Sequence, residues 1–149
     1  MGSHYSFEDL RNSPAVLIAA FNNRWTLQMT SNMPFVFAEK DGQGRIEERK
    51  PAGRVWSPRL GARGEVTADY AIVARQFDSK TGRLLIVAAG IGPRGTQAAG
   101  DFIAREDYLA DALRAAPRGW QRKNLEVVLE TDVIDTIPGP PRVVVAQFW

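Results

Sequence analysis

The chain has 149 residues, 44% of them hydrophobic and 24% charged, which is the composition of one ordinary globular domain. Its formal net charge is only +2, from 19 basic and 17 acidic residues, so the charge does not predict nucleic-acid binding. There is no cysteine, and the only histidine is His4, which excludes disulfides, zinc–sulfur sites and most histidine-dependent chemistry. We interpret residues 1–4, MGSH, as an expression remnant and 5–149 as a single α/β domain that could belong to a larger fold.

The first third of the chain predicts strands around one short helix. The run PAVLIAAF, residues 14–21, is continuously apolar and bounded by a proline, which predicts a buried central strand. Asn22 or Asn23 follows it and can cap a short helix. In residues 34–50, PFVFAEKDGQGRIEERK, we predict two strands joined in a hairpin at Asp41–Gly44.

The middle of the chain begins with a loop and ends in helices. Residues 50–68 are rich in Gly, Pro and Arg, which predicts a long surface loop with room for one short strand. Residues 69–78 and 83–89 flank the turn SKTG and predict an antiparallel hairpin. From Thr96 to Ala116 the pattern is helical, with a break near Ala104–Arg105.

The last third predicts a second antiparallel hairpin, between residues 124–134 and 141–149. In its first strand, alternation predicts that Leu125, Val127, Leu129 and Val133 point inward while Glu126, Glu130 and Asp132 point to solvent. The complete order, β-α-β-β-(β)-β-β-α-α-β-β, predicts an α/β fold of α+β character. Its sheet should be mixed, largely antiparallel and flanked by a few helices.

A glycine pattern, G-x-G-x-x-G, is formed by Gly90, Gly92 and Gly95 in RLLIVAAGIGPRGTQAAGDFI. A dinucleotide fingerprint needs a βαβ unit whose second strand ends in an acidic residue. Here the preceding strand is the second arm of a hairpin, and Asp111, the acid at about the fingerprint spacing, lies in a predicted helix. We therefore expect no nicotinamide or flavin cofactor, and the composition predicts no metal site.

The same stretch predicts a weaker site, because a helix start leaves backbone N–H groups that can hold an anion. We expect the helix to begin at Gly95 and Thr96, beside Arg94. If the strand before it runs parallel to strand 14–21, both carboxyl ends meet at one crevice. The predicted ligand-binding residues are Asn22, Asn23, Arg24, Trp25, Arg94, Gly95 and Thr96. In the alternative interpretation the asparagines only cap a helix, and the glycines only permit the turn and close packing.

Four stretches together resemble an uncharacterised bacterial carboxyl-terminal domain found in membrane-anchored or regulatory proteins: PAVLIAAFNNRWT, DYAIVARQFD, VAAGIGPRGTQAAGDFI and GPPRVVVAQFW. The resemblance spans the chain from Phe7 and implies no known activity. In that domain the residues matching Gly95–Thr96 and Ala98–Gly100 recur, whereas the residue at Gly92 varies. No apolar run approaches the roughly 20 residues that span a bilayer, which predicts a soluble domain. The resemblance leaves its compartment open, with a periplasmic or extracytoplasmic place in the parent protein as one option, and implies that it reaches a membrane only through a parent-protein anchor.

These observations favour a ligand-binding or sensory domain with no catalysis of its own, whose ligand is a small anionic or polar molecule. A second hypothesis is a protein-interaction or scaffold module, which would use sheet edges and the Arg54–Arg63 loop and could form a homodimer. A third is an enzyme acting on a phosphorylated small molecule. An ordered anion at the predicted helix start would favour the first or the third hypothesis.

Overall fold

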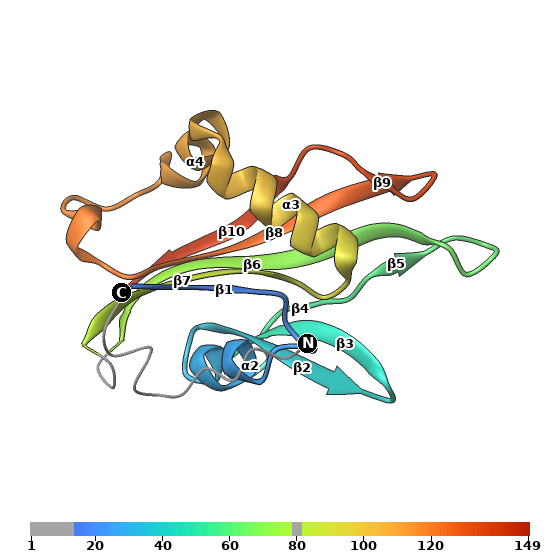
Figure 1. Ribbon diagram of the computed structural model, residues 1–149, viewed down its shortest axis with the longest axis horizontal. Coiled ribbons are helices and arrows are strands. Elements are labelled where there is room, and N and C mark those ends of the chain that lie inside the picture. The colour runs from blue at the N-terminus through green and yellow to red at the C-terminus, as the bar shows by residue number, and fades with distance from the viewer. Residues whose placement is uncertain (1–13, 79–81) are drawn as a thin grey trace.

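A computed structural model describes residues 14–78 and 82–149. It shows an α+β fold in three layers, with the large sheet in the middle (Figure 1). Two helices cover one face of this sheet, and a third helix and a small sheet cover the other. Within these ranges, none of the helices has the length and hydropathy that crossing a bilayer requires.

The large sheet is mixed and mostly antiparallel, as predicted. Its main strands are, in spatial order, β1 (Ala15–Ile18), β7 (Arg83–Gly90), β6 (Val66–Asp78), β8 (Leu125–Ile134) and β10 (Arg142–Phe148). Only β1 and β7 are parallel, and both predicted hairpins, β6–β7 and β8–β10, are antiparallel. Two short strands, β5 (Arg59–Leu60) and β9 (Ile137–Pro138), pair antiparallel with β6 and β8 at one end of the sheet (Figure 1).

The small sheet consists of β2 (Phe35–Lys40), β3 (Gln43–Glu48) and β4 (Val55–Trp56). The predicted hairpin is confirmed, and its turn residues Asp41 and Gly42 have φ of 53° and 75°, as a tight hairpin turn requires. The segment predicted as a loop with room for one strand contains two, β4 and β5. Each is only two residues long, so neither carries a readable alternation of apolar side chains.

The helices follow the predicted order. Asn23 caps α2 (Arg24–Thr30), and its Oδ1 accepts the Trp25 N–H at 3.0 Å. The predicted break near residue 105 separates α3 (Pro93–Ala104) from α4 (Glu106–Leu113), and a 3₁₀ turn, η1 (Trp120–Arg122), follows. Helix α3 begins at Pro93, two residues earlier than predicted, because proline suits the first helical position.

Two strand assignments from the sequence are wrong. Among the described residues, strand β1 lies at the edge of the sheet and is not central, and Leu17 is buried while Val16 and Ile18 are more than half exposed. Alternation predicts that strand β8 exposes one face. In the structure it lies between β6 and β10, and the layers on the two sides of the sheet cover both of its faces over much of its length. Glu126, predicted to point to solvent, is therefore 0% exposed.

The hydrophobic core is divided by the large sheet into two clusters. On the side of α2 and the small sheet it contains Met33, Phe35, Ile46, Ile72, Val87 and Val128. On the side of α3 and α4 it contains Ala71, Ala88, Ala99, Phe102, Val127 and Leu129. The small residues of the second cluster let α3 lie close to the sheet, and this closeness determines what can fit at the start of that helix.

Candidate functional site

The predicted crevice lies where β1 and β7 end. These strands are parallel and paired from Ala15–Leu85 to Ile18–Ala88, so their carboxyl ends meet at one edge as the prediction required. Apolar side chains occupy the space just beyond them. A Cβ placed on Gly44 would lie 2.6 Å from the Phe21 ring and 3.1 Å from Ile91 Cγ2. The chain's own packing therefore fills much of this edge.

The start of α3 already holds an anion, the carboxylate of Asp69 from β6. Its Oδ2 accepts the Gly95 N–H at 2.7 Å, and its Oδ1 accepts the N–H groups of Gly92 and Tyr70 at 3.2 and 2.8 Å. Asp69 is only 2% exposed. An external anion would have to displace this carboxylate to reach the same N–H groups, because the Gly95 N–H is already bonded to Asp69.

The three glycines of the G-x-G-x-x-G pattern are explained by close packing. A Cβ on Gly90 would lie 2.1 Å from the Thr96 nitrogen, and one on Gly95 would lie 2.4 Å from the Tyr70 carbonyl oxygen. The topology is not that of a dinucleotide unit either, because β6 separates β7 from β8. Asp111 lies in α4, as the sequence indicated.

Most of the other predicted ligand-binding residues have structural roles. The Thr96 hydroxyl accepts the Gly90 N–H at 3.0 Å and donates to the Gly92 carbonyl at 3.2 Å. Trp25 packs against the core on the α2 side. Asn22 and Arg24 are exposed, and Arg94 is half-buried. The structure thus brings the two predicted segments to one edge but leaves few of their polar groups available to a ligand.

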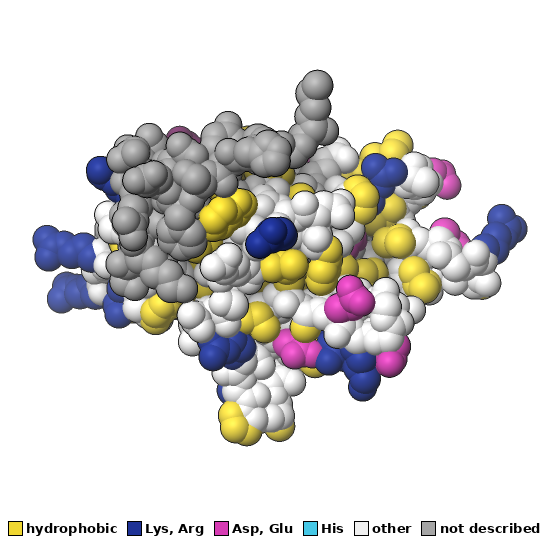
Figure 2. Space-filling view, turned by 60° about the horizontal axis from the view of Figure 1, so that its bottom comes forward, with side chains coloured by type: hydrophobic (Ala, Val, Ile, Leu, Met, Phe, Trp, Pro, Cys, Tyr) yellow, Lys and Arg dark blue, Asp and Glu magenta, His cyan; other side chains and the backbone are white. Residues whose placement is uncertain are grey.

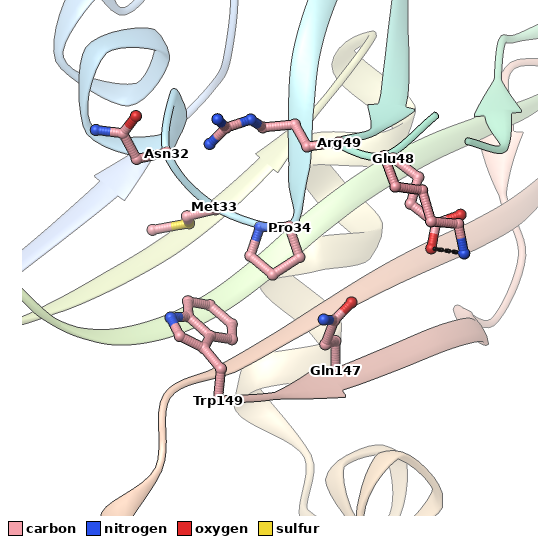
Figure 3. A pocket seen from close by; sticks show the side chains of 8 residues that line it. Asn32, Met33, Pro34, Glu48, Arg49, Gln147 and Trp149 are labelled. Carbon is pink, nitrogen blue, oxygen red and sulfur yellow. Dashed lines mark ion pairs between the residues drawn. The ribbon is translucent and has the colours of Figure 1, made fainter. Parts of the chain in front are cut away.

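A pocket of about 420 Å³ lies elsewhere, between the small sheet and the end of β10 (Figure 3). Three parts of the chain line it: the loop between α2 and β2, the end of β3 and the end of β10. The lining residues are Asn32, Met33, Pro34, Glu48, Arg49, Lys50, Gln147 and Trp149. None of these residues belongs to the predicted site, because the pocket arises only when β3 and β10 meet.

The electrostatics of this pocket are basic. The Glu48 carboxylate contacts Lys50 Nζ at 2.8 Å and Arg54 Nε at 2.9 Å, and these hydrogen bonds lower the pKa of Glu48 to about 2. Two cations thus face one carboxylate. Arg49 has its backbone N–H bonded to the Pro34 carbonyl at 2.8 Å, and among the described residues no ion pair involves its guanidinium. This guanidinium extends across the pocket towards Asn32 (Figure 3).

A buried carboxyl, Glu126, adjoins the pocket. Glu126 Oε2 accepts the Phe35 N–H at 2.8 Å, and Glu126 is paired across the strands with Gln147. Its Oε1 is buried without a hydrogen-bond partner, and burial raises the pKa of this carboxyl to about 8. The sequence held one indication, since Val128 lies on the same strand face as Glu126 and interrupts the polar alternation.

A second group of charges lies at the far end of the large sheet. Arg59 and Arg142 both pair with Glu130 and Asp132, and the Tyr70 hydroxyl donates to Glu130 at 3.0 Å. Two positive charges match two negative ones, so this group has no surplus charge to attract a ligand. On the face shown in Figure 2, basic, acidic and apolar side chains are likewise interspersed.

Comparisons with protein-family models, with curated proteins and with solved structures found no match to this chain. Within residues 14–78 and 82–149, the structure groups no set of three or more His, Cys, Asp or Glu side chains that could hold a metal ion.

Proposed function

We propose that this domain binds a small anionic ligand in the pocket between the small sheet and β10, with no catalysis of its own. The observation that carries the proposal is the Arg49 guanidinium, which reaches into the pocket while the neighbouring carboxylate, Glu48, is already neutralised by two other cations. A ligand with a carboxylate or phosphate group would supply the missing partner charge.

The lining chemistry fits such a ligand. A guanidinium offers paired N–H donors that match the two oxygens of a carboxylate or phosphate. Asn32 and Gln147 add amide groups, and the half-exposed indole of Trp149 provides an apolar wall for the rest of the molecule. Glu48 is held ionised by its cations, so it is a poor proton acceptor, and this favours binding over acid–base catalysis.

Titration calorimetry with sulfate, phosphate and succinate tests the proposal on the wild type, on Arg49→Ala and on Arg94→Ala as a matched control. We expect Arg49→Ala to weaken anion binding by roughly tenfold, the loss of one charge-assisted contact. Arg94→Ala should leave the affinity unchanged. If Arg94→Ala alone weakens binding, the anion binds at the start of α3, and if no anion binds the wild type, the proposal is wrong.

A second candidate function, self-association through an edge strand, is favoured by the surface of β1. Within the described residues β1 has β7 as its only neighbouring strand, and it contains no charged residue or proline. Val16 and Ile18 are 55% and 59% exposed, and Phe77 on the same sheet face is 56% exposed. Two copies could pair their β1 strands about a two-fold axis. If this pairing occurs, sedimentation should show a dimer for the wild type and a monomer for Ile18→Lys.

A further inference from the structure

Glu126 joins the two sheets at the wall of the pocket. Its strand, β8, belongs to the large sheet, whereas Phe35, the residue whose N–H it accepts, begins β2 of the small sheet. We propose that Glu126 is a proton-controlled latch: the closed interface between the two sheets accommodates its neutral form, whereas its ionised form leaves a buried charge with a single hydrogen bond, which destabilises that interface and disfavours an anion in the pocket. The effect on ligand binding rests on the proposed function, whereas the latch itself does not.

Within residues 14–78 and 82–149, no cationic side chain is paired with Glu126. Its cross-strand partners are Ala74 on β6 and Gln147 on β10, and Gln76 lies diagonally across on the same face. The titratable side chains on the surrounding elements are Glu48 at the end of β3, Arg49 and Lys50 just after it, and Tyr70 and Glu130 further along the large sheet. None of them is bonded to Glu126 in the structure, so an ionised form would have only the Phe35 N–H to stabilise it.

The unpartnered oxygens indicate which form the fold accommodates. Both Glu126 Oε1 and Gln76 Oε1 are buried without a hydrogen-bond partner, and an ionised carboxylate and an amide oxygen can only accept. A proton on Glu126 removes the charge of the carboxyl, and a site with no exposure and one hydrogen-bond donor accommodates the neutral acid better than a carboxylate. The same preference raises the pKa of Glu126, chiefly through burial, while the Phe35 N–H opposes the rise.

The effect reaches the pocket by two short routes. Pro34, which lines the pocket, is bonded directly to Phe35, and Gln147, which also lines it, is paired with Glu126 across the strands. Ionisation therefore places a negative charge directly behind the wall and weakens the packing of that wall.

The test uses sulfate, whose charge is constant between pH 6.5 and 9.5, with three proteins: wild type, Glu126→Gln and the control Glu39→Gln. Glu39 is an exposed acid on β2. We expect the sulfate affinity of the wild type and of Glu39→Gln to fall about tenfold from pH 7 to pH 9, as for one linked ionisation. Glu126→Gln should show no such fall. If the sulfate affinity of Glu126→Gln falls equally, ionisation of Glu126 is not coupled to anion binding in the pocket.

Direct titration separates the latch from the ligand. In the wild type, the Glu126 carboxyl ¹³C resonance and the Phe35 amide resonance should titrate together above pH 7, and the Phe35 titration should vanish in Glu126→Gln. If both titrate but sulfate never binds, the latch stands and the proposed function fails. If neither titrates above pH 7, the latch is wrong even where sulfate binds. If Glu126→Gln fails to fold, the titration of the wild type still decides whether Glu126 ionises above pH 7.

Discussion

The Asp69 carboxylate of β6 accepts the N–H of Gly95 at 2.7 Å, across 26 positions of sequence, and so caps α3 from outside the helix. A carboxylate at a helix N-terminus is stabilised by the macrodipole and by the otherwise unpaired N–H groups. Here the cap comes from the sheet on which the helix packs, so it fixes both the start of α3 and its position. This internal anion occupies the site that the glycine pattern suggested for a ligand.

Replacing Asp69 with Asn should destabilise the fold strongly. The amide has one acceptor oxygen where the carboxylate has two, and its NH₂ group would face N–H donors of the helix start. We expect a loss of roughly 2–4 kcal/mol in the free energy of unfolding, as for a buried charged acceptor with several partners. Urea denaturation measures it, and Asp101→Asn on the exposed side of α3 serves as the control. Equal effects of the two variants would contradict the capping role.

The two glycines Gly95 and Gly100 of α3 should respond oppositely to alanine. A Cβ on Gly95 would lie 2.4 Å from the Tyr70 carbonyl oxygen, whereas a Cβ on Gly100 would meet nothing within 4 Å. Gly95→Ala should therefore displace the helix and cost at least about 2 kcal/mol. Gly100→Ala should stabilise by roughly 0.5–1 kcal/mol through helix propensity. Thermal unfolding of both variants decides the matter, and a stable Gly95→Ala would show that α3 packs less tightly.

The stability of the protein should fall as the pH rises from about 4.5 to 8, because the folded state keeps the Glu126 proton longer than the unfolded chain does. Below pH 4.5 both states are protonated, and above pH 8 both are ionised, so this group contributes no slope there. The rise in the pKa corresponds to an upper limit of roughly 5 kcal/mol. Urea denaturation from pH 5 to 9 should show the slope in the wild type and a flatter curve in Glu126→Gln. Parallel curves would refute the assignment.

Two arginines should differ in their importance for stability. Arg75 donates to the Trp120 and Lys123 carbonyls at 2.9 and 2.6 Å and stacks on the Trp120 ring. Arg142 also makes ion pairs, but its own side chain is half exposed. Arg75→Ala should cost roughly 2 kcal/mol because it leaves carbonyls unpaired, while Arg142→Ala should cost about 1 kcal/mol or less. Denaturation at low and high salt tests this, and only the Arg142 effect should shrink with salt.

The sequence by itself determined the order of the elements and the nature of the sheet. Apolar alternation, the glycines at turns and the Asn23 cap are local properties, so the hairpins, the break between α3 and α4 and the start of α2 were all predictable. The absence of a dinucleotide unit followed from the hairpin before the glycines. The burial of each strand was harder to predict from the sequence, because a four-residue apolar run has the same composition at a sheet edge as at its centre.

Only the tertiary structure decided which polar groups are occupied and which are available. Asp69 reaches the start of α3 because the hairpin places β6 beneath that helix, and no pattern within either segment encodes this meeting. The pocket likewise joins the ends of β3 and β10, about a hundred positions apart in the chain. Glu126 is buried because a second layer, the small sheet, covers a strand face that alternation assigned to solvent. Local periodicity reports which residues share a face, but the packing of other elements determines what covers that face.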